Sequence, residues 1–383
     1  MTITRQTTER LRSQRTPFYY YDMDLLRETL TVASREAAMR GFTVHYAVKA
    51  NFNPVIMKAI AEYGFGADCV SGNEIEHALN CGFQAAETVF AGVGKSDYEL
   101  ETGLRLGIKC FNCESIAELK VLNEIAGRMG KKAPVAIRIN PNIEAHTIRH
   151  ITTGTDDNKF GIRITELDEV AAVLSGLSNI VFRGIHFHIG SQVTDLNPYR
   201  NLCTRVNQIY DWFTDRGLQP EVINVGGGLG INYDEPETLP PFAEYFNIFS
   251  THLDRKILSS ISFELGRSLT AGCGSLISSV LYVKEGAAET FVILDAGMTE
   301  LLRPALYHAF HLIENLTSEL PEKKYTVAGP VCETTDTFGK FIALPETRRG
   351  DLIAIRSAGA YGEVMASRYN LRSLPGSLFS NML

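Results

Sequence analysis

The sequence predicts an α/β fold: a parallel (β/α)8 barrel of the TIM-barrel type, followed by a second, mostly antiparallel β domain. Three observations support this prediction. Strand-like and helical segments alternate up to residue 270, residues capable of chemistry gather where the strand segments end, and beyond residue 270 strand-like runs follow one another. The structural alternative for the first part is a doubly wound parallel sheet.

The barrel prediction depends on eight strand candidates that are separated by helical segments. The strands are expected at residues 44–48, 66–70, 88–91, 108–112, 134–140, 182–188, 221–225 and 261–264. Apolar residues recur with helical spacing at 54–63, 73–81, 115–128 and 167–174. Strand followed by helix, repeated over roughly 250 residues, is the pattern of a closed parallel barrel. The wider, polar segment 142–160 is expected to cover the pocket.

The pattern after residue 270 is typical of an antiparallel β domain. Strands are expected at 276–283, 290–295, 325–328, 338–344 and 351–356, with one helix at 305–316. The strand-like run 18–21 precedes the barrel and is expected to add a strand to this second domain. The predicted domains are therefore a barrel at 24–270 and a β domain formed by 1–23 and 271–383.

Composition and charge argue against several classes of protein. The chain has 383 residues and a formal net charge of -7, so it shows no basic face for nucleic acid. No apolar stretch approaches the roughly 20 residues of a membrane span. The polar N-terminus lacks the apolar block of a secretory signal, so no such signal is expected. The seven cysteines are scattered, and Cys110 and Cys113 lack the second ligand pair of a zinc site. Free thiols in a reducing, cytoplasmic location are expected.

Lys49 is the first candidate catalytic residue, in the sequence YAVKAN at the end of the first predicted strand. A lysine at the end of a buried strand has a partly desolvated ammonium, which lowers its pKa and frees an amine nucleophile. This is the chemistry that a Schiff-base lysine needs. A single lysine in such a position is more often a solvated surface charge, so the residues downstream decide between the two interpretations.

Other strand ends carry Asp68, Arg138, His188 and Glu264. Active sites of such barrels lie at the C-terminal ends of the strands, so we expect these residues near one pocket. Glu264 could pair with a protonated ring nitrogen, and Asp68 could serve the same region. The alternative for either carboxylate is a helix N-cap or a salt bridge with Arg138.

His186 and His188 alternate along one predicted strand and therefore face the same side. Such a pair can bind a metal, or it can place one flat imidazole against a planar ligand. Metal binding would need more ligands from other strand ends, so no metal site is predicted. The glycine run Gly226–Gly230 has no side chains, and three to five of its N–H groups could bind a phosphate. Its alternative is a tight turn.

Six ordered motifs resemble the pyridoxal-phosphate-dependent decarboxylases that combine an alanine-racemase-like barrel with a β domain and act on ornithine, arginine or diaminopimelate. The motifs are YAVKAN at Lys49, HIGS from His188, the glycines 226–228, the segment from Glu264 to Arg267, Cys332-Glu333, and GAYG around Tyr361. The resemblance covers about residues 16–373. It is strongest to the members that decarboxylate diaminopimelate, because of DAGM from Asp295, RPALY from Arg303, and Glu333.

The resemblance implies pyridoxal 5'-phosphate as the cofactor. Lys49 would bind it covalently, His188 would stack on its ring, and Glu264 would keep the ring nitrogen protonated so that the ring accepts electrons from the departing CO2. Further contacts to the cofactor are implied for Asp68, Ser191, Gly227, Gly228, Gly266, Arg267 and Tyr361.

The resemblance also implies a substrate site. Arg267, Arg303, Tyr307, Glu333 and Tyr361 would hold the distal end of the substrate, and Cys332 would donate a proton to the α-carbon. In this family, Cys332 and Glu333 belong to the active site of the neighbouring subunit, so a homodimer with shared sites is implied. Leu265, in place of a usual proline, and Thr334-Thr335, in place of a common Ser-Gly, depart from the family pattern.

The expected reaction is the decarboxylation of meso-2,6-diaminopimelate to L-lysine and CO2, the last step of lysine biosynthesis. A planar guanidinium pairs with the distal carboxylate in a bidentate way, and it would reject ornithine because its own charge would stay buried and unpaired. Without the family resemblance, Arg303 would be interpreted as a surface arginine. The alternatives are a decarboxylase of ornithine, arginine or carboxynorspermidine, a metal-dependent barrel hydrolase, and a non-catalytic homologue that binds only a partner protein.

Overall fold

The structure is a computed structural model that describes residues 3–143 and 158–382. It divides into two compact units, each described by itself below. The barrel unit contains Leu30–Gly230 and Pro241–Gly266, and the β unit contains Met1–Thr29, Ile231–Pro240 and Arg267–Leu383. The predicted cover segment 142–160 lies largely outside the described residues.

The barrel unit contains a closed ring of eight parallel strands, as predicted. They are β2 (Thr43–Ala47), β3 (Gly66–Cys69), β4 (Thr88–Phe90), β5 (Cys110–Cys113), β6 (Ala133–Asn140), β8 (Ile180–His186), β9 (Val222–Gly227) and β10 (Ile261–Leu265). Their order is β5-β4-β3-β2-β10-β9-β8-β6, and a β5–β6 pairing closes the ring. Closure excludes the doubly wound alternative, and all eight predicted strand positions are confirmed. The short β7 (Ile162–Arg163) pairs with the end of β6.

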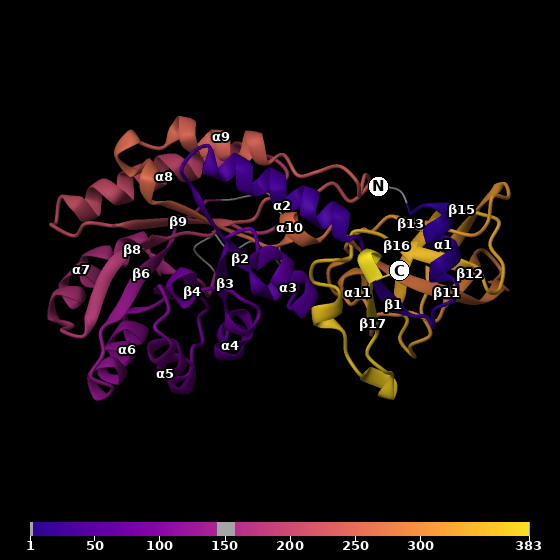
Figure 1. Ribbon diagram of the computed structural model, residues 1–383, viewed down its shortest axis with the longest axis horizontal. Coiled ribbons are helices and arrows are strands. Elements are labelled where there is room, and N and C mark those ends of the chain that lie inside the picture. Colours follow the sequence, from indigo (N-terminus) through magenta and orange to yellow (C-terminus); the bar gives the residue numbers. More distant parts are fainter. Residues whose placement is uncertain (1–2, 144–157, 383) are drawn as a thin grey trace. The chain divides into compact units, whose positions relative to one another are not determined.

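Helices connect the strands and lie outside the barrel (Figure 1). They are α2 (Met23–Ala38), which leads into the first strand, α3 (Pro54–Ala61), α4 (Gly72–Asn80), α5 (Asp97–Leu106), α6 (Ile116–Arg128), α7 (Leu167–Gly176), α8 (Asn197–Thr214) and α9 (Phe242–His252). Short 3-10 turns are η1 (Val48–Ala50), η2 (Ala85–Glu87), η4 (Ile164–Glu166) and η5 (Arg255–Ser260). The side chain of Ser71 caps α4 by accepting the N–H of Glu74, so the helix starts directly after its strand.

Aromatic rings join the helices of the barrel unit to one another and to its strands. The rings of Tyr199 and Tyr245 meet at 4.9 Å between centroids, and Phe249 meets Phe263 of β10 at the same distance. The barrel interior also contains a titratable group, His45 of β2, whose side chain is fully buried. Burial, with a smaller contribution from the charge of Lys109, lowers the pKa of His45 to about 4. His45 is therefore neutral at ordinary pH.

The β unit is mostly antiparallel, as predicted. Its strands are β1 (Phe18–Tyr21), β11 (Gly274–Glu285), β12 (Thr290–Leu294), β13 (Ile313–Asn315), β14 (Glu322–Ala328), β15 (Thr337–Pro345), β16 (Leu352–Ile355) and β17 (Gly376–Phe379). Strand β1 pairs antiparallel with β11, which confirms that this segment joins the second sheet. The helical elements are α1 (Arg5–Leu11), α10 (Arg267–Thr270), α11 (Arg303–Tyr307), η6 (Glu363–Met365), η7 (Tyr369–Leu371) and η8 (Ser380–Met382).

The predicted helix at 305–316 is wrong over most of its length. Helix α11 ends at His308, whose φ of 53° lies in the left-handed region, and the chain then enters β13. A left-handed residue ends a helix because the next N–H groups turn back to the last carbonyls. Beyond it, a short apolar run cannot be assigned to helix or strand from periodicity alone.

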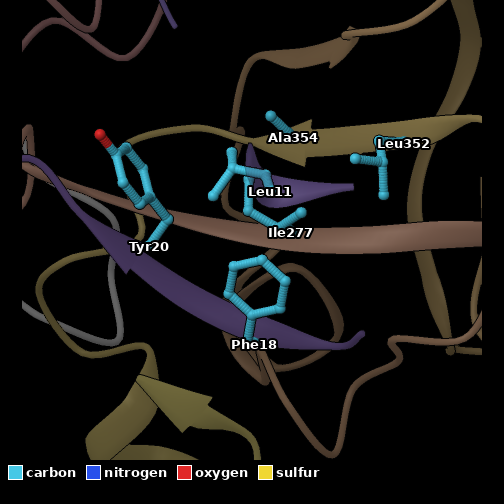
Figure 2. Packing of buried hydrophobic residues seen from close by; sticks show 6 residues of the cluster. All are labelled: Leu11, Phe18, Tyr20, Ile277, Leu352 and Ala354. Carbon is cyan, nitrogen blue, oxygen red and sulfur yellow. The ribbon is translucent and has the colours of Figure 1, made fainter. Parts of the chain in front are cut away.

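One core of the β unit lies between α1 and the sheet. Figure 2 shows its buried side chains, Leu11, Phe18, Tyr20, Ile277, Leu352 and Ala354, which come from α1 and from strands β1, β11 and β16. Segments from both ends of the chain thus build this unit. Within residues 3–143 and 158–382, no helix is both long and apolar enough to cross a bilayer.

Candidate active site

Lys49 lies directly after β2, in the 3-10 turn η1 rather than in the strand itself. Its Nζ is 3.5 Å from Oδ2 of Asp68, which stands opposite Ala47 on the neighbouring strand β3. The Lys49 side chain is 38% exposed and that of Asp68 is fully buried. Burial and the charge of Glu264 raise the pKa of Asp68 to about 8, although Lys49 opposes this rise. The amine therefore faces a carboxyl group that can exchange a proton near neutral pH.

The alternative interpretations of Asp68 are wrong. It does not cap α4, because Ser71 occupies that position. It does not pair with Arg138, whose guanidinium instead donates to Glu114 over 2.7 Å in a buried ion pair. Glu114 was not predicted as a site residue from the sequence.

Glu264, at the end of β10, is held by side chains from three other strands. Its Oε1 accepts hydrogen bonds from the side-chain amides of Asn112 at 3.2 Å and Asn224 at 2.8 Å, and its Oε2 lies 3.0 Å from Nε2 of His186. Burial opposes ionisation, but His186 and then Lys49 outweigh it, so the pKa of Glu264 is well below its usual range. The barrel interior thus contains a fixed, ionised carboxylate.

His188, just beyond β8, is a neutral imidazole. Its Nδ1 lies 3.2 Å from the backbone N–H of Gly227, which donates to it, so the ring proton is on Nε2. Burial lowers its pKa well below the usual value, and the positive charges of Arg138 and Lys49 add to this effect. A neutral ring is suited to lie flat against an aromatic ligand.

The glycine run is a close-packed turn with fewer available amides than predicted. Gly226 and Gly228 have φ values of 73° and 97°, which favour glycine. A Cβ at Gly227 or Gly228 would collide with the backbone carbonyls of Glu264 or Gly190, respectively. The amides of Gly226, Gly227 and Gly230 already donate to groups of the protein. Among the described residues none accepts from the amide of Gly228, which leaves this group for an anion.

Two further predicted cofactor contacts lie in the barrel unit. Gly266 follows β10, and a Cβ there would come within 2.9 Å of the side chain of Ala50, so its lack of a side chain lets β10 pack against the turn that carries Lys49. Ser191 is partly exposed after β8.

The histidine pair does not form a metal site in the described part of the chain. His186 contacts Glu264 instead, and no group of three potential His, Cys, Asp or Glu ligands is found among the described residues. All seven cysteines are free, and only Cys332 is exposed. Burial raises the pKa of the Cys110 thiol to about 12 and that of Cys113 well above its usual value, so both are inert thiols.

The β unit contains a second group of polar residues, centred on two arginines. Arg303 and Arg267 are 4% and 6% exposed, so the interpretation of Arg303 as a surface residue is wrong. Both guanidinium groups donate to the hydroxyl of Tyr233, over 2.9 Å and 2.7 Å. The guanidinium carbon of Arg267 also lies 4.8 Å from the ring centroid of Tyr361, a residue with a left-handed φ of 56°.

The remaining predicted substrate residues of the β unit reach solvent. Tyr307 is partly exposed at the end of α11, and Cys332 and Glu333 are exposed in the loop before β15. The carboxylate of Glu333 accepts a hydrogen bond of 2.6 Å from the hydroxyl of Tyr369. The backbone N–H of Cys332 donates to Asn370 over 3.3 Å.

Several residues of these sites were missed by the sequence analysis. Asn112, Asn224 and Glu114 lie at the ends of predicted barrel strands, and a polar residue in a buried strand is costly unless it is hydrogen bonded. That cost is a signal that could have indicated them. Tyr233 gave no such signal, because its arginine partners are far away in sequence. His311, whose Nε2 lies 2.8 Å from Nη1 of Arg303, gave none either, because Arg303 was not predicted as buried.

Comparison with known proteins is consistent with this arrangement. Residues 26–271 match the family described as pyridoxal-dependent decarboxylase, pyridoxal binding domain. The diaminopimelate decarboxylase of Bacteroides thetaiotaomicron is 52% identical over 98% of each chain, and that of Aquifex aeolicus is 41% identical over 93% of this chain and 84% of its own. The crystal structure of the Helicobacter pylori diaminopimelate decarboxylase complexed with L-lysine superimposes with a TM-score of 0.92 at 40% identity, covering 97% of this chain and 93% of that one.

Proposed function

Because this chain belongs to the pyridoxal-dependent decarboxylases, we propose that it converts meso-2,6-diaminopimelate to L-lysine and CO2 with pyridoxal 5'-phosphate as its cofactor. The observation that carries the proposal is the pairing of a nucleophilic amine with a fixed carboxylate inside one barrel. Lys49 supplies the amine, and Glu264 supplies a carboxylate that stays ionised although it is buried.

The residues of the barrel unit fit this cofactor. A buried carboxylate needs a cationic partner, and a protonated pyridine nitrogen provides one at Glu264. The neutral His188 offers a flat face for an aromatic ring, and the amide of Gly228 offers a donor for a phosphate oxygen. When bound, the cofactor supplies an electron sink for the bond that breaks as CO2 leaves.

The barrel residues have separate tasks in this proposal. Lys49 would hold the cofactor covalently, would be displaced when the substrate amine binds, and would act as the nucleophile again to release the product. Asp68, whose pKa is raised to about 8, can take a proton from the Lys49 ammonium and return it. Glu264 holds a proton on the ring nitrogen. His186 keeps Glu264 in place.

The β unit would bind the distal end of the substrate. Arg267 and Arg303 would pair with the distal carboxylate of the substrate. Tyr307 and Tyr361 would contact the carbon chain of the substrate next to that carboxylate. A substrate without that carboxylate, such as ornithine, leaves the buried charge of Arg303 without an anion, which makes it a poor substrate. A panel of ornithine, arginine, carboxynorspermidine and diaminopimelate therefore separates the alternatives.

A homodimer with shared active sites is part of the proposal. Cys332 and Glu333 are exposed within a single chain, so they are available to a second copy. Cys332 would give the proton that replaces CO2 on the α-carbon, and Glu333 would meet the distal ammonium. The six buried free thiols suit a reducing, cytoplasmic location.

A complementation experiment tests the shared site. Lys49→Ala and Cys332→Ala proteins are each expected to be inactive, and mixing them under subunit exchange should restore about a quarter of wild-type activity, the share of intact sites in a random heterodimer mixture. Product formation measured before and after mixing gives the answer. Absence of rescue, with heterodimers demonstrated by tagged copies, would assign both residues to one chain.

The reaction itself is tested by adding meso-diaminopimelate to the cofactor-loaded protein. Equal amounts of CO2 and L-lysine are expected, with no turnover of ornithine. Release of CO2 from ornithine in preference to diaminopimelate would show that the proposed substrate is wrong. A protein that binds zinc but not the cofactor would show that the proposed reaction class is wrong and would favour a metal-dependent hydrolase.

A further inference from the structure

We infer that Tyr233 and His311 are positioning residues that set the guanidinium groups of Arg303 and Arg267 for one carboxylate of the substrate. The inference rests on the proposed function and adds the determinants of its carboxylate specificity. It is drawn entirely from contacts within the β unit, to which all four residues belong.

His311 fixes one side of Arg303. Its Nε2 lies 2.8 Å from Nη1 of Arg303, and its Nδ1 lies 2.8 Å from the backbone carbonyl of Arg356. A guanidinium has no acceptor and a carbonyl has no donor, so Nε2 accepts and Nδ1 carries the proton. Burial lowers the pKa of His311 to about 3, and the charge of Arg303 contributes to this. His311 is therefore a permanent acceptor for Arg303 at ordinary pH.

Tyr233 fixes both arginines together. Its hydroxyl oxygen accepts from Nη1 of Arg267 and from Nη1 of Arg303, which uses both of its lone pairs. Its ring packs edge-on against His311, with 5.1 Å between centroids and an interplanar angle of 79°. One phenol thus sets the spacing between two cations and supports the imidazole that holds one of them.

These contacts leave a defined edge of Arg303 for a ligand. Among the described residues, all hydrogen bonds to its side chain are made by Nη1, with one proton going to Tyr233 and one to His311. The Nε and Nη2 protons form the other edge of the guanidinium, and this edge has the geometry of a bidentate carboxylate contact.

The hydrogen-bond acceptors of Arg303, Tyr233 and His311, are both neutral, and this explains why the site would select an anionic ligand. Arg303 forms no ion pair with any described residue, and burial lowers its pKa, with a further contribution from Arg267 against the effect of Tyr233. A carboxylate in place of Tyr233 or His311 would hold the arginines equally well but would neutralise them. A phenol and a neutral imidazole hold the guanidinium group of Arg303 and leave its positive charge to a ligand.

The test compares Tyr233→Phe with the wild type. This substitution keeps the ring and removes only the oxygen. The KM for meso-diaminopimelate and the inhibition constant of L-lysine should each rise about tenfold, equivalent to about 1.4 kcal/mol. The kcat should change much less, because the distal carboxylate is bound equally before and during the reaction. Inhibition by 1,5-diaminopentane, which is L-lysine without its carboxylate, should not change.

Two further sets of variants keep the test decisive. His311→Gln retains a hydrogen-bond acceptor for Arg303, whereas His311→Leu has none. The KM for meso-diaminopimelate should therefore rise less in His311→Gln than in His311→Leu. Tyr282→Phe, on an exposed tyrosine of β11, is the matched control and should leave all constants unchanged. Unchanged inhibition of Tyr233→Phe by L-lysine, or equal losses for L-lysine and 1,5-diaminopentane, would overturn the inference. Failure of the wild type to act on diaminopimelate would instead refute the proposed function.

Discussion

Replacing Lys49 with alanine is expected to lower the turnover of meso-diaminopimelate by at least about 10⁴-fold, the size of effect seen when a catalytic nucleophile is removed. The amine that bonds to the cofactor is lost, and Asp68 loses its ion-pair partner. Besides kinetics, borohydride reduction followed by mass spectrometry of the Lys49 peptide checks the assignment. The wild-type peptide should carry the mass of the cofactor.

Two control variants distinguish the loss of the Lys49 nucleophile from the loss of its positive charge. Lys49→Arg can keep an ion pair with Asp68, but its guanidinium is not a nucleophile, so it should be as inactive as Lys49→Ala. Lys58→Ala removes an exposed lysine of α3 and should behave like the wild type. Trapped cofactor on a peptide other than that of Lys49 would contradict the assignment.

Replacing Glu264 with glutamine is expected to reduce kcat by about 10²- to 10³-fold, comparable to the loss of one preorganised electrostatic group. A neutral amide cannot hold a proton on the ring nitrogen. It also brings an N–H₂ group toward Asn112 and Asn224, whose amides now donate to the carboxylate. The dissociation constant of the cofactor, measured without substrate, should rise as well.

Glu244→Gln, on the exposed side of α9, is the matched control for the loss of one carboxylate in the same unit. Its kcat and cofactor affinity should equal those of the wild type. Wild-type kcat in a folded Glu264→Gln protein would show that the ionised carboxylate has no role in the reaction.

The strands of the barrel and the residues at their ends could be predicted because each is indicated by a short, continuous stretch of sequence. The positions of Lys49, His188 and Glu264 follow from where buried runs of sequence stop. The network around Glu264 could not be predicted, because Asn112 and His186 meet it only after the barrel closes. Alternation along a strand placed His186 and His188 on one face, yet one contacts a carboxylate and the other a backbone amide.

The contacts of Tyr233 could not be predicted from the sequence for a different reason. It follows the glycine run in sequence, so the chain pattern places it in the barrel, but residues Ile231–Pro240 pack with the β unit. Its two guanidinium partners lie 34 and 70 residues away in sequence. No periodicity or composition relates groups at such separations.

Buried neutral histidines make the protein sensitive to acid in both of its units. The pKa values of His45 and His311 are lowered in the folded state to about 4 and about 3, from an unfolded value of 6.5. Below pH 6.5 these two histidines bind protons in the unfolded chain but stay neutral in the folded chain. Each histidine then removes about 1.4 kcal/mol of folding free energy per pH unit, until its folded pKa is reached. Since His45 lies in the barrel unit and His311 in the β unit, mild acidification lowers the stability that each unit contributes, before either imidazole is charged in the native protein.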